Sequence, residues 1–352
     1  MSKKTISTII QLIVFLGLGI GLMLWRYDAI SAKDKADMFE AFGHIRWLWA
    51  APLLGVGFLA HYFRSLRWKM LMAPLHVYPS TTNTVFAVLI GYLANALIPR
   101  LGEVAKCTIL AKYEKVPADK LVGTIIAERA FDVVCLAILL LATLLFQFDV
   151  IYPFAQKLGT KVFLDEAGQV KWLHFGIALI ALIFISVVFI RLFKKIKRSK
   201  VGQIIQGIGD GLRTIGQIKN KARFLLLTFL IWLMYAGLII IGFWAMPEMS
   251  GITLFAALSI LTFGSVGMIA TPGGIGAYPV IIAEVLILYG ISSGIGFAYG
   301  WVSWAGQTAI VVILGLASLI LLPLYNRSKD NDQQTRHYSR ENHDPESVAT
   351  GR

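Results

Sequence analysis

The residues Asn95-Ala96-Leu97-Ile98-Pro99-Arg100-Leu101-Gly102-Glu103 interrupt one membrane-length apolar stretch, and Thr271-Pro272-Gly273-Gly274-Ile275-Gly276 interrupt a second. Proline and glycine free backbone polar groups that cannot face lipid, so each break must be buried in protein or line a wet cavity. Broken helices in two parts of one membrane protein are the best pointer in a sequence to the binding site of a transporter. The two breaks therefore predict both the architecture and the place of the site.

The composition excludes a soluble protein of ordinary type. The chain has 352 residues, of which 57% are hydrophobic, and its mean hydropathy is +0.70. Its net charge of +13 could suggest nucleic-acid binding, but the basic residues gather in one loop that contains the single acid Asp210. Basic residues beside membrane spans indicate orientation and contact with anionic lipid, so we do not expect a nucleic-acid partner. The basic residues of this loop are Lys194, Lys195, Lys197, Arg198, Lys200, Arg213, Lys219, Lys221 and Arg223.

Apolar runs of about 20 residues predict the spans of the membrane. The broken stretches cover about 82–110 and 252–288, and we expect each to form a hairpin of two half-helices. The predicted fold is therefore an all-α polytopic membrane protein with about six full spans and two re-entrant hairpins; eight or more spans are the alternative if each half-helix crosses. The single spans are expected at about 6–25, 47–63, 121–146, 172–193, 224–245 and 297–324.

The distribution of basic residues predicts the orientation. Lys69 precedes the first hairpin and Lys112 and Lys115 follow it, so both of its ends are expected in the cytoplasm. Arg327 and Lys329 place the end of the last span inside as well. Counting back from there, the second hairpin must enter from the outside. We therefore expect a cytoplasmic-membrane protein with both termini in the cytoplasm and two hairpins that enter from opposite faces.

Three regions of different character are expected within this layout. Residues 1–325 are predicted to form one transmembrane domain, in which the basic, amphipathic loop 194–222 lies on anionic lipids of the inner leaflet. Residues 326–352 are polar and poor in apolar side chains, which predicts a disordered cytoplasmic tail. Cys107 and Cys135 have neither metal nor disulfide spacing and are read as packing residues.

Three charged residues interrupt the apolar segment 121–146. Glu128 and Asp132 are one helical turn apart, and Arg129 is three residues before Asp132, which is a spacing at which the two can pair. A charge at the centre of a span costs about 2.5–3.5 kcal/mol, and such residues usually mark transport pathways. The sequence leaves two readings open: a structural ion-pair knot between helices, or a functional group that relays protons or contacts a headgroup.

The tip of the first hairpin also carries charge. Arg100 and Glu103 lie at the tip, Lys106 follows one turn later, and a helix is expected to begin near Gly102. The free N–H groups and positive dipole end of that helix, with the two cations, predict an anion site suited to phosphate. The alternative is a shallow hairpin from which Arg100 merely reaches the membrane surface.

The remaining candidates carry weaker signals. The glycines of the second hairpin permit a tight turn, which could serve packing only or could bring Thr271, Tyr278 or Glu284 to a ligand. Arg64, Arg67 and Trp68 close the span 47–63 and are interpreted as interfacial residues. No nucleophile motif, phosphate loop or metal-ligand spacing is present, so no catalytic residue, cofactor or metal ion is predicted.

Four motifs together resemble a known family, the flippase-like membrane proteins related to the transmembrane domain of lysylphosphatidylglycerol synthases. The resemblance implies an inner-membrane protein that moves a phospholipid or a polyprenyl-linked lipid between leaflets. Pro279 stands where that family usually has an acid, and Glu284 is the nearest substitute; no aminoacyl-transferring domain follows residue 324, so lipid aminoacylation is not expected. The motifs are Arg64-x-x-Arg67-Trp68, Asn95-x-x-Ile98-Pro99-Arg100-x-Gly102-Glu103, Glu128-Arg129-x-x-Asp132 and Thr271-Pro272-Gly273-Gly274-Ile275-Gly276.

The leading hypothesis is a translocase for a phospholipid or polyprenyl-phosphate lipid. A lipid-modifying membrane enzyme or accessory subunit and a proton-coupled transporter of a small solute are the alternatives, and a homo-oligomer is compatible with all three. The expected headgroup-binding residues are Asn95, Arg100, Lys106 and Arg129. The expected proton or charge relay consists of Glu103, Glu128, Asp132 and Glu284. The expected hairpin turns contain Pro99, Gly102, Thr271, Pro272, Gly273, Gly274 and Gly276.

Overall fold

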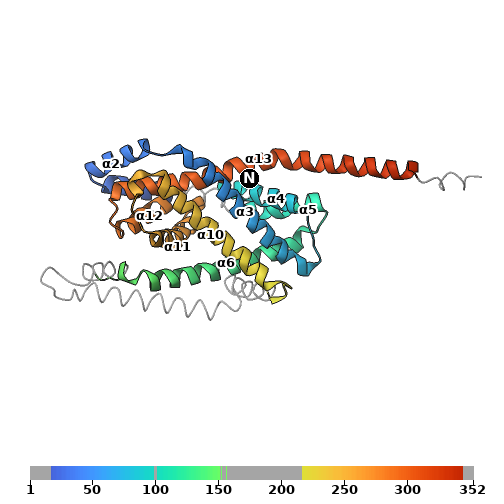
Figure 1. Ribbon diagram of the computed structural model, residues 1–352, viewed down its shortest axis with the longest axis horizontal. Coiled ribbons are helices and arrows are strands. Elements are labelled where there is room, and N and C mark those ends of the chain that lie inside the picture. Colours follow the sequence, from blue (N-terminus) through green and yellow to red (C-terminus); the bar gives the residue numbers. More distant parts are fainter. Residues whose placement is uncertain (1–16, 99–100, 151, 153–155, 157–215, 344–352) are drawn as a thin grey trace, which may run out of the picture.

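The computed structural model describes residues 17–98, 101–150 and 216–343, together with 152 and 156 (Figure 1). Every regular element among these residues is a helix, so the all-α class predicted from the sequence is confirmed there. Residues 17–29 are helical as well. The α-helices are α2 (Ala32–Gly43), α3 (Ala50–Met72), α4 (Thr81–Leu97), α5 (Leu101–Glu114), α6 (Ala118–Phe146), α10 (Lys221–Ala245), α11 (Leu254–Ala270), α12 (Ala277–Ile287) and α13 (Ser293–His343).

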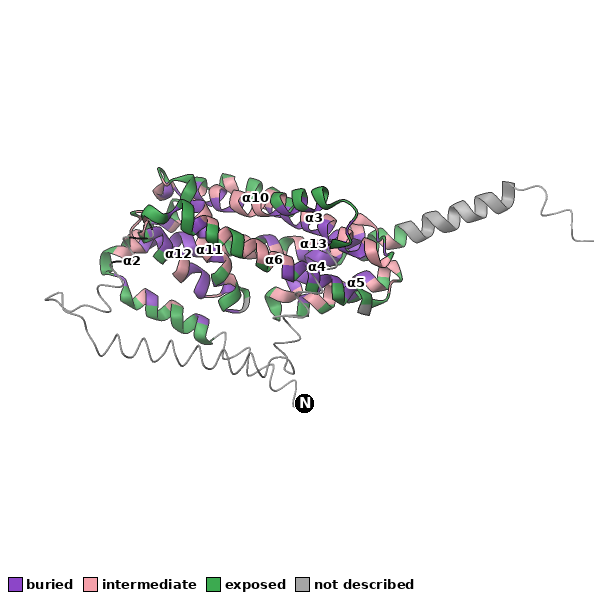
Figure 2. Cartoon of the chain, turned by 90° about the horizontal axis from the view of Figure 1, so that it is seen from below, coloured by how far each residue is buried: buried purple, intermediate pink, exposed green. Residues whose placement is uncertain are grey.

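Three of the described helices are long and apolar enough to cross a membrane: Lys120–Phe146, Lys221–Ala245 and Ser293–Ser328. They coincide with three of the spans predicted from the sequence. Figure 2 shows exposed residues along α6 and α10, where large apolar side chains such as those of Leu145 and Phe229 are mostly exposed. Such apolar surfaces suit contact with lipid. The span predicted at 172–193 and most of the basic loop lie outside the described residues.

Two helical hairpins occupy opposite ends of the bundle. Helices α4 and α5 pack together at one end of the long axis, and α11 packs on α12 at the other (Figure 1). Between them α4 contacts the short 3-10 helix η4 (Pro272–Gly274), which is the turn of the second hairpin. In the first hairpin α4 has 17 residues and α5 has 14, and in the second α11 has 17 and α12 has 11. At about 1.5 Å per residue, each is shorter than a hydrocarbon core of about 30 Å. Their insertion as re-entrant segments, and the total number of spans, stay predictions.

The apolar interior forms two clusters of buried residues, one toward each end. The first joins α2, α10, α11, α12 and α13, with Phe243, Ile260 and Tyr299 among its members. The second joins α3, α4, α5 and α6, with Trp68 and Leu110 among its members. Helix α10 contributes to both, because Phe224 near its start belongs to the second cluster and Phe243 near its end belongs to the first. The hairpins are thus held in two separate cores connected by long helices.

The two ends of the bundle differ in charge. The amide group of Asn83, at the start of α4, donates to Glu114 at the end of α5 (2.6 Å) and to Asn326 of α13 (3.0 Å). This end carries the basic group Lys69, Lys112, Lys115, Lys120, Lys221, Arg223 and Arg327. The opposite end contains α2 and the C-terminal end of α10, where His44 lies 2.7 Å from Glu248. There five acids lie among four bases, so this end is nearly neutral. The acids are Asp28, Asp34, Asp37, Glu40 and Glu248, and the bases are Arg26, Lys33, Lys35 and Arg46.

The last helix is longer than the sequence suggested. Helix α13 has 51 residues and continues to His343, so residues 326–343 are helical where the composition predicted disorder. The physical reason is that a helix nucleates at a cost but propagates readily, and these residues extend a helix that already exists. Composition alone describes an isolated segment and misses this continuity.

Candidate functional site

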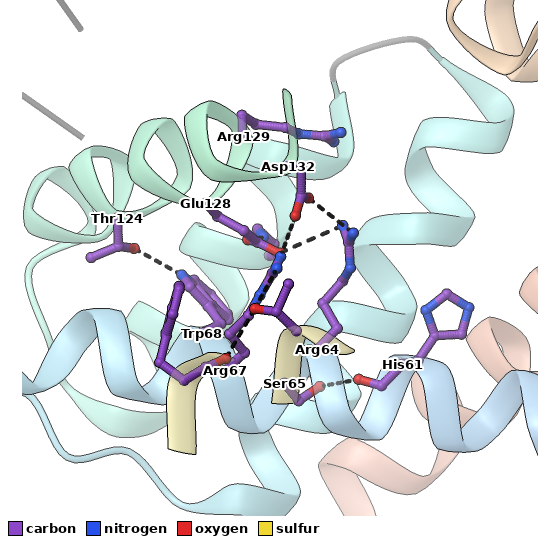
Figure 3. Close-up of polar contacts among 12 residues, drawn as sticks. His61, Arg64, Ser65, Arg67, Trp68, Thr124, Glu128, Arg129 and Asp132 are labelled. Carbon is purple, nitrogen blue, oxygen red and sulfur yellow. Dashed lines mark hydrogen bonds and ion pairs between the residues drawn. The ribbon is translucent and has the colours of Figure 1, made fainter. Parts of the chain in front are cut away.

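Five charged side chains from three helices meet inside the second core and form what we call the charge cluster. Arg64 and Arg67 lie three residues apart on α3, and Glu128 and Asp132 lie four apart on α6, so each pair occupies one face of its helix. Lys106 comes from α5, the returning helix of the first hairpin. Figure 3 shows the two arginines reaching from α3 toward the carboxylates of α6.

The ion pairs of the charge cluster are short and connected. The two oxygens of Asp132 accept from Nη2 of Arg67 (2.6 Å) and from Nη2 of Arg64 (3.0 Å). Glu128 accepts from Nζ of Lys106 through Oε2 (2.8 Å), and its Oε1 lies 3.5 Å from Arg64 and 3.6 Å from Arg67. Each carboxylate therefore touches more than one cation.

The charge cluster is buried and has an excess of positive charge. The side chains of Arg67 and Glu128 are 0% and 2% exposed, whereas that of Asp132 is 16% exposed. Three cations face two carboxylates, which leaves one positive charge without a counter-charge in the cluster. The Nε atoms of both arginines and Oε1 of Glu128 are buried and have no hydrogen-bond partner. Buried charges are normally paired and hydrogen-bonded, so spare donors and a cationic excess favour an anionic ligand.

Neighbouring aromatic and hydroxyl groups fix the cations in place. Nζ of Lys106 lies 4.4 Å from the centre of the Trp68 ring, and Nε1 of Trp68 donates to the Thr124 hydroxyl at 2.8 Å. Arg67 donates to the Thr228 hydroxyl of α10 at 3.4 Å. The Arg64 guanidinium lies 5.7 Å from the Tyr92 ring of α4. Cations held over ring faces in a dry surrounding are stabilised without losing their charge.

Arg64, Arg67 and Trp68 lie in the last three turns of α3, which continues to Met72, and all three are buried. The carboxylates of α6 compensate the two arginines, so their side chains need no contact with water. The two arginines belong to the charge cluster, and the interfacial depth expected for the three residues stays a prediction.

Arg129 does not pair with Asp132, contrary to the spacing argument. It pairs with Glu103 of α5 at 3.1 Å, and its side chain is 52% exposed. Asp132 instead accepts hydrogen bonds from Arg64 and Arg67 of α3. Glu103, Lys106, Glu128, Arg129 and Asp132 are thus brought together across α5 and α6, though in other pairs than expected.

The first hairpin is closed by Asn95 and Gly102. The backbone N–H of Gly102 donates to the Asn95 side-chain oxygen at 2.8 Å. A Cβ atom at Gly102 would overlap the carbonyl oxygen of Gly91, so glycine is required where the two helices cross. Asn95 therefore has a structural partner within the hairpin, in addition to the headgroup role proposed for it. Pro99 and Arg100 lie outside the described residues.

The second hairpin forms a tight turn at the other end of the bundle. Gly273, Gly274 and Gly276 have φ angles of 64°, 72° and 74°, which L side chains rarely adopt. The Thr271 hydroxyl donates to the carbonyl of Ile275 at 2.9 Å and closes the turn, and Nε1 of Trp304 donates to the carbonyl of Gly273 at 2.7 Å. Pro272, which was also expected in this turn, is the first residue of η4.

Glu284 lies apart from the charge cluster. It is on α12 and pairs with Arg26 at 2.9 Å, and Arg26 also donates to the Ser293 hydroxyl at 2.7 Å. This pair joins the helix at 17–29 to the second hairpin and to α13. The relay predicted from the sequence is therefore divided between two ends of the bundle. Among the described residues, no group of three or more His, Cys, Asp and Glu side chains is placed to hold a metal ion.

The spanning helices and the buried charge cluster define a multi-pass membrane protein. Residues 9–315 match the family described as the lysylphosphatidylglycerol synthase TM region, which covers most of the chain. The chain belongs to this family, as the four motifs of the sequence suggested. No curated protein and no solved structure matches the chain.

Proposed function

We propose that this protein moves a phosphate-bearing lipid between the leaflets of the cytoplasmic membrane and binds the headgroup at the charge cluster. The observation that carries the proposal is the cationic excess of that cluster: two buried arginines and the mostly buried Lys106 with two carboxylates, and arginine Nε donors that have no hydrogen-bond partner. Guanidinium and ammonium groups are the usual partners of phosphate in proteins. A site of this charge favours a headgroup with at least one negative charge.

The surface beside the charge cluster supports a lipid rather than a small solute. On α6, Glu128 and Asp132 face inward, while Ile126, Arg129 and Val133 on the same helix are 46%, 52% and 56% exposed. A headgroup can therefore approach from the side of the helix while its acyl chains stay against apolar side chains. A soluble solute would need a path from the aqueous ends instead.

The placement of the hairpins supports movement between two faces. The first hairpin supplies Lys106 to the charge cluster, and the second lies at the opposite end of the bundle with its turn against α4. Hairpins that enter from opposite faces would allow access from either side in turn. By the positive-inside rule, the basic end is expected in the cytoplasm, in contact with anionic inner-leaflet lipids.

The test is leaflet exchange in sealed liposomes that contain the purified protein. We expect faster exchange of a fluorescent phospholipid or polyprenyl-phosphate probe than in empty liposomes, and a loss of about tenfold or more in Lys106→Ala, because a charged contact of about 1.5–3 kcal/mol is removed. Lys112→Ala is the matched control, since Lys112 is exposed near the end of the same helix. Equal exchange in Lys106→Ala and wild type would overturn the headgroup site.

The same experiment separates the alternative class. If a folded sample exchanges no probe, mass spectrometry of the lipids would show whether one of them is covalently changed. A modified lipid would identify a membrane-embedded enzyme, and the charge cluster would then be its headgroup site.

A further inference from the structure

The two arginines of the charge cluster are arranged as a fork around one carboxylate. Nη2 of Arg67 and Nη2 of Arg64 donate to separate oxygens of Asp132, at 2.6 and 3.0 Å. Two guanidinium groups on two oxygens of one anion is also the arrangement in which proteins bind phosphate. We infer that Arg64 and Arg67 form a lipid-phosphate site whose place the Asp132 carboxylate holds in this structure. The inference rests on the proposed function for the class of ligand.

The fork does not depend on Asp132 for its position. Arg67 is fully buried, donates to the Thr228 hydroxyl at 3.4 Å and lies 5.9 Å from the Phe224 ring. Arg64 lies against Tyr92, on a helix that packs on both α3 and α5. The donors therefore stay in place when Asp132 leaves, and a preorganised site binds its ligand with a smaller loss of conformational freedom.

Asp132 is the carboxylate that can leave, and Glu128 is not. Glu128 is 2% exposed and lies within 3.6 Å of Lys106, Arg64 and Arg67. Asp132 is 16% exposed, and its ion-pair partners in the described part of the chain are the two arginines. Rotation of one side chain toward the exposed face of α6 releases Asp132, whereas release of Glu128 would break contacts with three cations from two helices.

A phosphate suits the vacated fork better than the carboxylate does. The Nε donors of Arg64 and Arg67 are buried and unpartnered while Asp132 occupies the fork. A phosphodiester has two charged oxygens and two ester oxygens, so it offers more acceptors than a carboxylate for these donors. Its single negative charge equals that of the carboxylate it replaces, and the charge of the site is unchanged by the exchange.

The test measures binding rather than transport. The full chain in detergent is titrated with phosphatidylglycerol, phosphatidylcholine or inorganic phosphate, and bound lipid is counted by native mass spectrometry. Asp132→Asn is expected to bind phosphatidylglycerol about tenfold more tightly than wild type, because the internal competitor has lost its charge. Glu248→Gln is the matched control: it removes the same charge from an ion pair with His44 at the other end of the bundle, and its affinity is expected to stay near that of wild type.

Thermal unfolding of the same samples keeps the inference testable if Asp132→Asn folds poorly. Phosphatidylglycerol should then raise its unfolding temperature more than that of wild type, because the lipid phosphate replaces the missing carboxylate. Equal affinity in Asp132→Asn and Glu248→Gln, or an Asp132→Asn variant that stays unfolded with the lipid present, would overturn the inference. An equal effect of inorganic phosphate would overturn the assignment to a lipid. Tighter binding without leaflet exchange would retain the fork and remove the translocase.

Discussion

At the scale of single residues, the charge cluster shows how charges become stable inside a membrane protein. Glu128 is almost completely buried and has three cations within ion-pair distance. Removing one partner of a buried ion pair leaves the other charges without compensation, which costs more than the pair itself contributes. Exposed pairs behave differently, because water already solvates both partners. The same substitution should therefore have very different effects at the two kinds of position.

Glu128→Gln is expected to lower the free energy of unfolding by about 3–5 kcal/mol, because Lys106 and both arginines lose a shared counter-charge. Glu103→Gln, in a half-exposed pair with Arg129, is expected to lower it by less than about 1 kcal/mol. Denaturant unfolding in detergent micelles, followed by tryptophan fluorescence, measures both. Similar losses of unfolding free energy in the two variants would show that burial does not determine how much each ion pair contributes to stability.

At the scale of the helical elements, the first hairpin depends on a close crossing of α4 and α5. Gly91 and Gly102 face one another there: a Cβ at Gly91 would lie 2.9 Å from the carbonyl oxygen of Gly102 and 3.0 Å from Cβ of Lys106. The crossing thus sets the distance between α4 and the helix that carries Lys106. A wider crossing would move the ammonium group away from Glu128.

Gly102→Ala is expected to destabilise the protein by about 1–3 kcal/mol, since the added methyl group would overlap the Gly91 carbonyl oxygen and force the hairpin apart. Gly123→Ala is the control, because a Cβ there meets nothing within 4 Å on α6. That variant is expected to be neutral or up to about 1 kcal/mol more stable, as alanine favours a helix over glycine. Thermal unfolding of both variants measures the difference, and a stabilised Gly102→Ala would contradict the close crossing.

At the scale of the whole molecule, the charge difference between the ends of the bundle predicts its orientation. Both ends of the first hairpin lie at the basic end, near Lys69 and Lys115, and both ends of the second lie at the opposite, nearly neutral end, near Glu248. If the hairpins are re-entrant, the two flanks of each must be reached from the same side of the membrane. Full spans would place the flanks on opposite sides.

Single cysteines test this layout in a chain that lacks Cys107 and Cys135. Tyr78→Cys and Lys115→Cys, which flank the first hairpin, are expected to react with an impermeant maleimide from the cytoplasmic side only. Thr253→Cys and Ser292→Cys, which flank the second, are expected to react from the outside only. Labelling of intact cells reports the cysteines that are accessible from the outside, and labelling of inverted vesicles reports those accessible from the cytoplasmic side. Labelling of Tyr78→Cys and Lys115→Cys from different sides would replace the hairpin with crossing helices.

Sequence patterns predicted the local features well, and long-range partners less well. The breaks at Pro99 and Pro272 gave the positions of both hairpins, because proline and glycine act on the backbone next to them. The partners of Arg64 and Arg67 were missed, since those lie on α6, more than 60 residues away in the chain, and spacing within one helix favoured the Arg129–Asp132 pair instead. One signal in the sequence could have indicated this pairing. Two arginines three residues apart and two acids four residues apart each form one charged face in an apolar segment, and the two faces are opposite in charge.

The packing between distant segments could not be predicted from the sequence either. Gly19 contacts the second hairpin, where a Cβ atom would overlap the carbonyl oxygen of Ile275, and Gly276 likewise meets the Gly19 backbone. Gly17 and Gly21 have the four-residue spacing of small residues at helix contacts, yet a Cβ at either would meet nothing within 4 Å. Which face of a helix meets its neighbour depends on the whole bundle, which no local pattern encodes.

The distance in sequence between the two halves of the charge cluster has a consequence for how the protein is made. Helix α3 has 23 residues, but with Arg64 and Arg67 it is not among the helices apolar enough to span a membrane alone. Each arginine costs about 2.5–3.5 kcal/mol at the centre of an inserted helix. Glu128 leaves the ribosome 64 residues after Arg64, which is a delay of about 3–13 s at about 5–20 residues per second. We therefore expect the arginine-bearing turns of α3 to settle in the bilayer only when the carboxylates of α6 arrive.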